Sequence, residues 1–305
     1  MLYQLPQLGL VCITASNEVR FRTVTRRTLS KLSVGEQTEK LREIYLANIK
    51  RLRAAIAFCS RHQFKLYRLS SNLFPFADEP IGETILTEFE SDLAQIGSQA
   101  QQQQTRLVLH PNQYVVLNSD RPQVIQNSVK VLTTYARILD LLGLPRSPWA
   151  LMNIHGGKGD RMERLVENIL KLPEGVRSRL TIENDEHTYN SNQIAEICHD
   201  VQIPMVFDAH HHLVCEQLDS YNHSSIENAL ELARTTWQHP EWQLVHISNG
   251  RDRLHDTKHS DFIDCMPESF RTVPWIEVEA KKKEEAIFRL RRDWLNSISP
   301  IEMLA

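Results

Sequence analysis

Cysteine, glycine and long apolar segments are all scarce in this sequence of 305 residues. No segment reaches the roughly 20 consecutive apolar residues that a membrane helix needs, and the first residues lack the basic flank and apolar core of a secretory signal. We therefore expect a cytoplasmic protein without a membrane partner. The five cysteines are scattered and have no CxxC spacing, which argues against a disulfide framework and against a thiolate zinc site.

Glycine-rich phosphate-binding loops are missing as well. The chain has only 10 Gly, and neither a Gly-x-Gly-x-x-Gly pattern nor a P-loop follows the first predicted strand. An open nucleotide-binding sheet is therefore disfavoured. With 41% hydrophobic and 24% charged residues, the chain can nevertheless bury a large core, as an ordinary globular protein does.

The formal net charge of −3 gives little sign of a nucleic-acid partner if the charges are spread evenly. The basic residues are clustered, however. Arg20, Arg22, Arg26, Arg27 and Lys31 lie in one segment, and Arg251, Arg253 and Lys258 lie in another. Such clusters are often no more than solvated loops, but they are also candidates for contacts with phosphate groups.

Short β-rich segments alternate with segments of 3.6-residue apolar spacing from end to end. The predicted strands are Gln7–Thr14, Lys65–Ser70, Arg106–His110, Ala150–His155, Arg179–Glu183, Pro204–Asp208, Gln243–Ile247 and Trp275–Glu279. Strands separated by helices predict parallel βα units, and eight such units favour a closed barrel. We expect an α/β protein with a (β/α)8 TIM barrel of parallel strands, formed as a single domain by residues 1–305.

Potential metal ligands stand at or just after the ends of six predicted strands. They are His110, His155, Glu183, Asp208, His211, His246 and Glu279. A lone histidine or acid at a strand end is more often structural. In a barrel, however, these ends converge on one rim, where the active sites of such enzymes lie, and structural residues on six separate strands would have no reason to share it. Imidazoles and carboxylates without thiolates favour Mn²⁺, Zn²⁺ or Fe²⁺, and so many ligands imply more than one ion.

At these residues the chain resembles the UV damage endonuclease family, and more distantly endonuclease IV and sugar isomerases. The motifs that carry the resemblance are 67–71, 110–115, 153–160, 182–185, 207–211 and 278–281. The resemblance implies two or three divalent ions, typically Mn²⁺. It adds His259 to the ligands named above, and it implies that Gln113 and Tyr114 probe the lesion by entering the duplex.

The function implied is incision of double-stranded DNA on the 5′ side of UV photoproducts, both cyclobutane pyrimidine dimers and 6-4 photoproducts. The products would be a 3′-hydroxyl and a 5′-phosphate. We expect catalytic roles for Glu183, Glu279 and Lys281, DNA contacts from Lys158 and Arg68, and a monomer. The alternatives are an abasic-site endonuclease, an aldose–ketose isomerase and a DNA-binding barrel without activity; the last would lack ligands.

Three positions depart from the family pattern. Glu79 replaces a usual histidine, and we expect it to serve as a carboxylate ligand. Leu10 stands where many members have an aromatic residue, so a stacking contact is not expected there. Leu244 stands where some members carry a modified lysine, so no bridging carbamate is expected. These departures mark a divergent member of the family.

Overall fold

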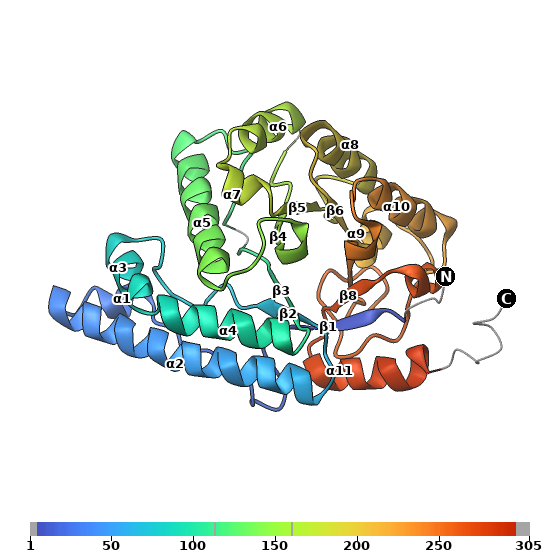
Figure 1. Cartoon of the computed structure of the whole chain (residues 1–305). Helices are drawn as coiled ribbons and strands as arrows, with labels where there is room; N and C mark the ends of the chain where they lie inside the picture. Colours follow the sequence, from blue (N-terminus) through green and yellow to red (C-terminus); the bar gives the residue numbers. More distant parts are fainter. Residues whose placement is uncertain (1–4, 113, 160, 297–305) are drawn as a thin grey trace.

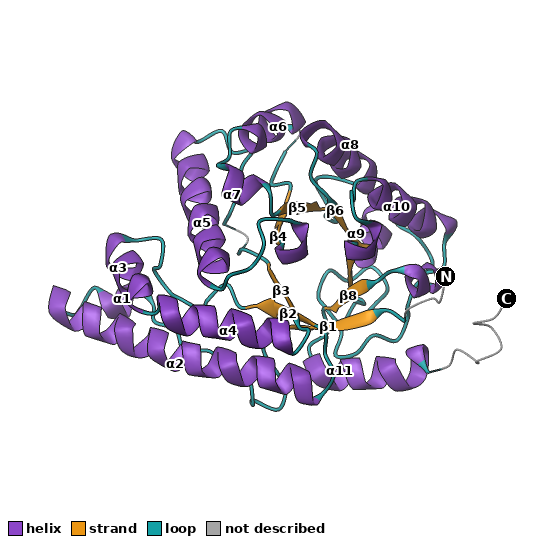
Figure 2. Ribbon diagram, in the orientation of Figure 1, coloured by secondary structure: helices purple, strands orange, loops and turns teal. Residues whose placement is uncertain are grey.

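The structure, a computed structural model, describes residues 5–112, 114–159 and 161–296. Eight parallel strands close into one barrel in sequence order (Figures 1 and 2). They are β1 (Gln7–Val11), β2 (Leu66–Leu69), β3 (Arg106–Leu109), β4 (Met152–His155), β5 (Leu180–Glu183), β6 (Met205–Asp208), β7 (Leu244–Ile247) and β8 (Trp275–Val278). The predicted (β/α)8 barrel is confirmed. The strands are shorter than predicted, most of all β1, which ends at Val11 and not at Thr14.

Helices surround the barrel, and Figure 1 shows α2 and α4 side by side along one flank. The helices are α1 (Arg26–Leu29), α2 (Val34–Arg61), α3 (Pro80–Glu88), α4 (Glu90–Gln102), α5 (Pro122–Leu141), α6 (Met162–Leu170), α7 (Glu174–Arg177), α8 (Ser191–Val201), α9 (Ala209–Cys215), α10 (Ser224–Thr235) and α11 (Lys283–Leu290). Among the described residues, no helix is long and apolar enough to span a membrane.

Local sequence signals explain where the helices begin. Ser33 and Glu36 form a reciprocal capping box at the start of α2. Asp208, the last residue of β6, accepts the backbone N–H of His211 at 2.8 Å and so caps α9 without any connecting loop. Because no loop intervenes, the end of β6 and the first turn of α9 hold their side chains in a fixed relation at the rim.

The inside of the barrel is apolar below and polar above. The apolar layer contains Leu66, Val108, Leu151, Val206 and Leu244, all of which are buried. Each stands two residues before a polar residue of the rim, so side-chain alternation stacks one above the other. Leu244 therefore lies directly below His246 in this apolar layer. Leu10, by contrast, is buried in the separate core between strands and helices.

Candidate metal centre

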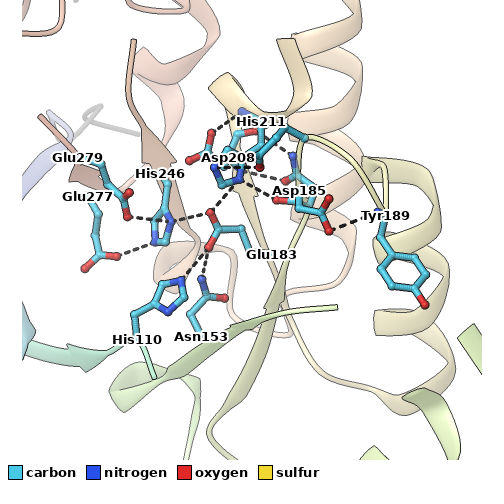
Figure 3. Close-up of polar contacts among 12 residues, drawn as sticks. His110, Asn153, Glu183, Asp185, Tyr189, Asp208, His211, His246, Glu277 and Glu279 are labelled. Carbon is cyan, nitrogen blue, oxygen red and sulfur yellow. Dashed lines mark hydrogen bonds and ion pairs between the residues drawn. The ribbon is translucent and has the colours of Figure 1, made fainter. Parts of the chain in front are cut away.

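Glu183, at the end of β5, is the centre of the polar rim (Figure 3). Its side chain is buried, and each carboxylate oxygen has two partners. Oε2 lies 3.2 Å from His110 Nε2 and accepts the Asn153 amide at 2.5 Å. Oε1 lies 3.1 Å from His246 Nδ1 and 3.3 Å from His211 Nδ1. Nitrogen atoms from residues at or near the ends of four strands thus surround one carboxylate. One of the four, from His211, belongs to the first turn of α9.

Two sets of ligand atoms gather around this carboxylate. In one set, His110, His155 and Glu183 each offer an atom within 4.8 Å of the others. In the second set, Glu183, Asp208 and His246 meet the same limit. Because Glu183 belongs to both, its two oxygen atoms lie between two sites that could each hold a metal ion.

Unpartnered buried atoms show that the donor set fits metal ions. His155 Nδ1, Asp208 Oδ2 and Glu277 Oε1 are buried and have no hydrogen-bond partner within the described part of the chain. Buried polar atoms are nearly always bonded, and an unpaired one costs about 1–3 kcal/mol. His155 belongs to one set and Asp208 to the other, so each set includes a residue with a buried atom that the described protein leaves unpaired, as suits a bound cation.

The charges of the cluster alter its protonation strongly. Burial would raise the pKa of Glu183, but His246 and His155 outweigh burial and hold that pKa well below its usual range. Burial would lower the pKa of His246, yet the carboxylates of Glu183 and Glu277 raise it to about 10. Burial would also lower the pKa of His211, but the carboxylates of Asp208 and Glu183 raise it to about 9. Without metal, these imidazolium groups balance the carboxylates.

Arg68 of β2 forms the floor of the site. Its guanidinium makes a close ion pair with Glu277 and lies 2.6 Å from Glu279 Oε1. Its Nη2 is also 2.9 Å from His246 Nε2, which in turn lies 2.6 Å from Glu277 Oε2. Arg68 is only 6% exposed. The structure therefore places its charge among rim carboxylates, and its predicted DNA contact stays untested.

His211 is oriented by its surroundings on the other side of the site. Its Nδ1 lies 3.0 Å from the carbonyl oxygen of Asn184, and Asn184 exchanges two hydrogen bonds with the backbone of Asp208. Its Nε2 lies 3.7 Å from a carboxylate oxygen of Glu186. These contacts join the loops after β5 and β6 at the position where both strands deliver ligand candidates.

The remaining predicted residues lie at different distances from this cluster. His259 Nδ1 is 3.8 Å from Glu279 Oε2, at the edge of the site. Glu79 is half-buried at the start of α3 and forms an ion pair with Arg26. Lys158 and Lys281 are exposed. Their predicted roles remain predictions.

The two residues predicted to probe DNA follow His110 in the loop after β3. Tyr114 is 76% exposed, and its backbone N–H donates to Asn112 Oδ1 at 3.0 Å, which shapes the turn that presents it. Gln113 lies outside the described residues. Tyr114 therefore presents an exposed aromatic ring four residues after a ligand candidate in the chain, and its predicted role remains a prediction.

The residues that the sequence reasoning missed act through the ligand candidates. Glu277 precedes Glu279 by two residues, so strand alternation turns both side chains into the barrel, and this spacing was the available signal. Asn153 precedes His155 in the same way and donates to Glu183. Asn153 lies in a motif noted from the sequence, and Glu277 lies in a predicted strand. Their roles became visible only with the register of neighbouring strands.

Comparison with known proteins agrees with this geometry. A family model described as UV-endonuclease UvdE matches residues 6–305. The UV DNA damage endonuclease of Nostoc sp. is 54% identical over 95% of this chain and 91% of that protein. The protein of the same name from Deinococcus radiodurans is 47% identical over 94% of this chain and 95% of that protein.

Solved structures show the same similarity. The crystal structure of SacUVDE aligns with a TM-score of 0.80 at 27% identity and covers 96% of this chain and 100% of that chain. Endonuclease IV from Thermus thermophilus aligns with a TM-score of 0.62 at 17% identity, covering 96% of this chain and 100% of that chain. At that identity the second likeness concerns the fold alone.

Proposed function

This chain belongs to the UV-endonuclease UvdE family, and from that premise we propose that it incises double-stranded DNA on the 5′ side of UV photoproducts. The substrates are cyclobutane pyrimidine dimers and 6-4 photoproducts, and the products are a 3′-hydroxyl and a 5′-phosphate. The observation that carries the proposal is the rim carboxylate of Glu183, which is shared by two sets of metal-ligand atoms. We further propose that residues 1–305 act as one domain and as a monomer.

Two or three divalent ions, most simply Mn²⁺, are the proposed cofactors. His110, His155 and Glu183 would hold one ion, and Glu183, Asp208 and His246 a second; His211, His259 and Glu279 remain for these or a third. Such ions supply a water molecule acidic enough to attack phosphorus near neutral pH, together with positive charge for the phosphate oxygens. The water oxygen bonds to phosphorus as the bond to the 3′ oxygen breaks, and that oxygen leaves as a hydroxyl.

The protein's own residues fix the geometry of this reaction. Asn153 donates to Glu183 and keeps its carboxylate from rotating. Arg68 and Glu277 hold the His246 ring through its Nε2 atom, which leaves Nδ1 directed at Glu183. Supporting contacts of this kind orient ligands and typically change metal affinity or activity by roughly 10–100-fold.

Recognition of the lesion is proposed for the exposed end of the loop after β3. The Tyr114 ring can replace the stacking that is lost when damaged bases leave the helix, and damaged bases need less energy to unstack. Gln113 would act beside it. The exposed ammonium groups of Lys158 and Lys281 would contact phosphates, with Lys281 serving the site from just beyond Glu279.

A direct test uses the purified chain, Mn²⁺ and end-labelled duplexes. Each duplex carries one cyclobutane dimer, one 6-4 photoproduct, one abasic site or no lesion. We expect a cut 5′ to both photoproducts, with ends that a polymerase extends and a ligase accepts. Incision of the abasic duplex alone would instead identify an abasic-site endonuclease, and no incision with any divalent metal would refute the proposal.

The probe residues have their own test. Changing Tyr114→Ala together with Gln113→Ala should reduce incision of the damaged duplex by about tenfold or more, because stacking on an aromatic residue contributes roughly 1–3 kcal/mol. Metal content, measured by elemental analysis, should stay the same. A matched control is Tyr3→Ala, which changes a tyrosine outside the site motifs. Loss of metal in the double variant would instead make these residues part of the metal centre.

A further inference from the structure

Two basic residues on adjoining loops beside the metal centre form no ion pair with any described acid. Arg20 lies in the loop between β1 and α1, and Lys283 is the first residue of α11, just after β8. Strands β1 and β8 pair directly, with Gln7 opposite Trp275. The two loops therefore meet above neighbouring strands of the barrel (Figure 1).

Arg20 is fixed in place but only partly satisfied. Its Nε donates to Asn17 Oδ1 at 2.8 Å, and its carbonyl oxygen accepts a bond from Arg51 of α2 at 3.2 Å. Its Nη1 atom is buried and has no hydrogen-bond partner in the described part of the chain. No described carboxylate forms an ion pair with it, whereas most other arginines of the protein have one.

Lys283 is similar in this respect. Its side chain is half-buried, and among the described residues its ammonium group takes part in no ion pair. The groups whose charges act on it include Cys12, Glu279, Arg68 and Arg20. Burial lowers the pKa of Lys283, whereas burial raises that of the Cys12 thiol to about 11, so Cys12 supplies no negative charge at neutral pH.

Glu279 is one acid in that surrounding, and it is already engaged. Its carboxylate lies 2.6 Å from Arg68, 3.5 Å from His246 and 3.8 Å from His259. Glu279 is therefore shared among other partners, and no described acid forms an ion pair with Arg20 or Lys283. Two cations without such a partner, on an enzyme of phosphodiesters, favour an anion.

The loops that carry the two residues are held rigidly together. The buried carboxylate of Glu284 accepts the backbone N–H groups of Ala15 at 2.7 Å and Ser16 at 2.8 Å, and thereby joins the start of α11 to the loop after β1. Thr14 Oγ1 closes the same loop by accepting the N–H of Val19 at 2.9 Å. Arg20 and Lys283 are thus positioned by the fold before any ligand arrives.

We propose that Arg20 and Lys283 form a binding site for one DNA phosphate that neighbours the phosphate being cut. The inference rests on the proposed function. The guanidinium and the ammonium group would share the two non-bridging oxygen atoms, as pairs of Arg and Lys do for phosphates elsewhere. The neighbouring lysine at position 282 does not fit this role, since it lies 3.9 Å from Glu285 and pairs with it.

The test replaces single phosphates of the substrate by uncharged groups. Duplexes with one cyclobutane dimer carry a neutral methylphosphonate at one of the four linkages that flank the incised bond. Incision and affinity are measured for the full chain with Mn²⁺, for Lys283→Met, for Arg20→Gln and for Lys283→Arg. With the unmodified duplex, Lys283→Met should bind about tenfold more weakly, and the slope of log affinity against log salt should fall by about 1.

The linkage at which the effect occurs identifies the site. Wild-type protein should bind the duplex about tenfold more weakly when one particular flanking linkage is neutral. Lys283→Met and Arg20→Gln should each bind that duplex as well as they bind the unmodified duplex. Lys283→Arg, which keeps the positive charge, should keep the loss of affinity caused by the neutral linkage at that position. Lys171→Met is the charge-matched control, because this lysine is exposed and pairs with Glu167 on α6; it should keep the full sensitivity.

The possible outcomes are separable. Suppose that wild-type protein cuts the dimer, but both variants show the same loss of affinity at every neutral linkage and the same salt slope as wild type. Then the proposed phosphate site is wrong and the endonuclease proposal stands. If wild-type protein neither binds nor cuts the duplex, both proposals fail. Thermal unfolding separates a folding defect from lost binding, since removal of an unpaired half-buried charge should leave the melting temperature of Lys283→Met unchanged or raised.

Discussion

Arg68 and Arg106 stand on neighbouring strands inside the same barrel, yet they are satisfied in opposite ways. Arg106, in the end of the barrel away from the metal centre, donates to the backbone carbonyls of Trp149 at 2.8 Å and of Pro148 and Trp242 at 2.9 Å. Its guanidinium also lies 4.7 Å from the centre of the Trp149 ring. No carboxylate forms an ion pair with it among the described residues. Burial lowers its pKa to about 9, so it remains charged at neutral pH.

Arg68, at the rim, is satisfied by side chains that also belong to the metal centre. Its partners are Glu277, Glu279 and His246, and each of them has a second contact within the cluster. Backbone carbonyls cannot exchange their partner without unfolding. Carboxylates and imidazoles can pass theirs to a cation or a substrate. One end of the barrel is therefore built for stability and the other for exchange, as this fold generally divides its faces.

The largest effect should come from Glu183→Gln, which changes the central residue of the rim, where side chains can exchange partners. The amide keeps the shape but removes the charge shared by both ligand sets. We expect bound metal to fall by at least one ion and incision by more than about 100-fold, beyond what loss of a supporting contact costs. Elemental analysis and single-turnover incision measure the two effects. Full metal content with full activity would remove Glu183 from the centre.

Arg106→Met tests the stable end. The change keeps much of the volume but leaves three backbone carbonyls without their donor, so the free energy of unfolding should fall by roughly 3 kcal/mol. Metal content and incision at 25 °C should stay at wild-type values, because the change lies below the apolar layer. Chemical denaturation and the assays above measure both. A variant that keeps its stability but loses metal would contradict the assignment of Arg106 to stability alone.

The division itself could be predicted in part from the sequence. The strand pattern located all eight strands, and strand-end residues such as His110 and Glu183 do converge on one rim. Arg68 was predicted as a DNA contact, a role that stays untested, and its motif gave no sign that the side chain is buried. Its burial follows from the register of β2 with β1 and β3, which no single strand contains.

Glu79 and Lys283 show the same limit in loops. Glu79 was predicted as a ligand, which stays untested, and its ion pair with Arg26 depends on how α1 lies against the start of α3. Lys283 looked like any surface lysine in a run of three. Only the packing of the start of α11 against the loop after β1, joined by the contact between Ala15 and Glu284, which are 269 positions apart, brings its loop beside that of Arg20.

Arg68→Met makes the comparison between the two arginines direct. The change leaves Glu277 with one partner fewer and frees the His246 ring on the Nε2 side. We expect metal affinity to fall by roughly 10–100-fold, as for other supporting contacts, in contrast to the unchanged affinity of Arg106→Met. Titration with Mn²⁺ measures the affinity. If Arg68→Met and Arg106→Met both lose stability and both keep their affinity for Mn²⁺, then Arg68 is also purely structural.

The pH dependence of the metal-free protein should separate the two ends further. The pKa values of His246, about 10, and His211, about 9, are raised above the unfolded value of about 6.5. Their contribution to stability is therefore complete below pH 6.5 and is lost as the pH rises toward 9 and 10, by at most about 1.4 kcal/mol per pH unit for each proton. Denaturation at several pH values measures this loss.

Bound Mn²⁺ should weaken or reverse that trend, because a metal ligand must be unprotonated and metal affinity therefore rises with pH. His246→Asn, which cannot carry the proton, should flatten the curve of the metal-free protein. A metal-free protein whose stability is constant between pH 6.5 and 9 would contradict the charge balance described for the rim.

Glu79→Gln should have the smallest effect, and it tests whether the metal centre extends as far as the start of α3. The carboxylate pairs with Arg26, whose side chain is 57% exposed, and exposed ion pairs contribute about 0–1 kcal/mol. If this pair is its whole role, metal content should not change and the free energy of unfolding should fall by less than about 1 kcal/mol; Arg26→Gln is the matched control. If Glu79 binds metal as the family pattern predicts, Glu79→Gln alone should lose an ion, because only the carboxylate serves both roles.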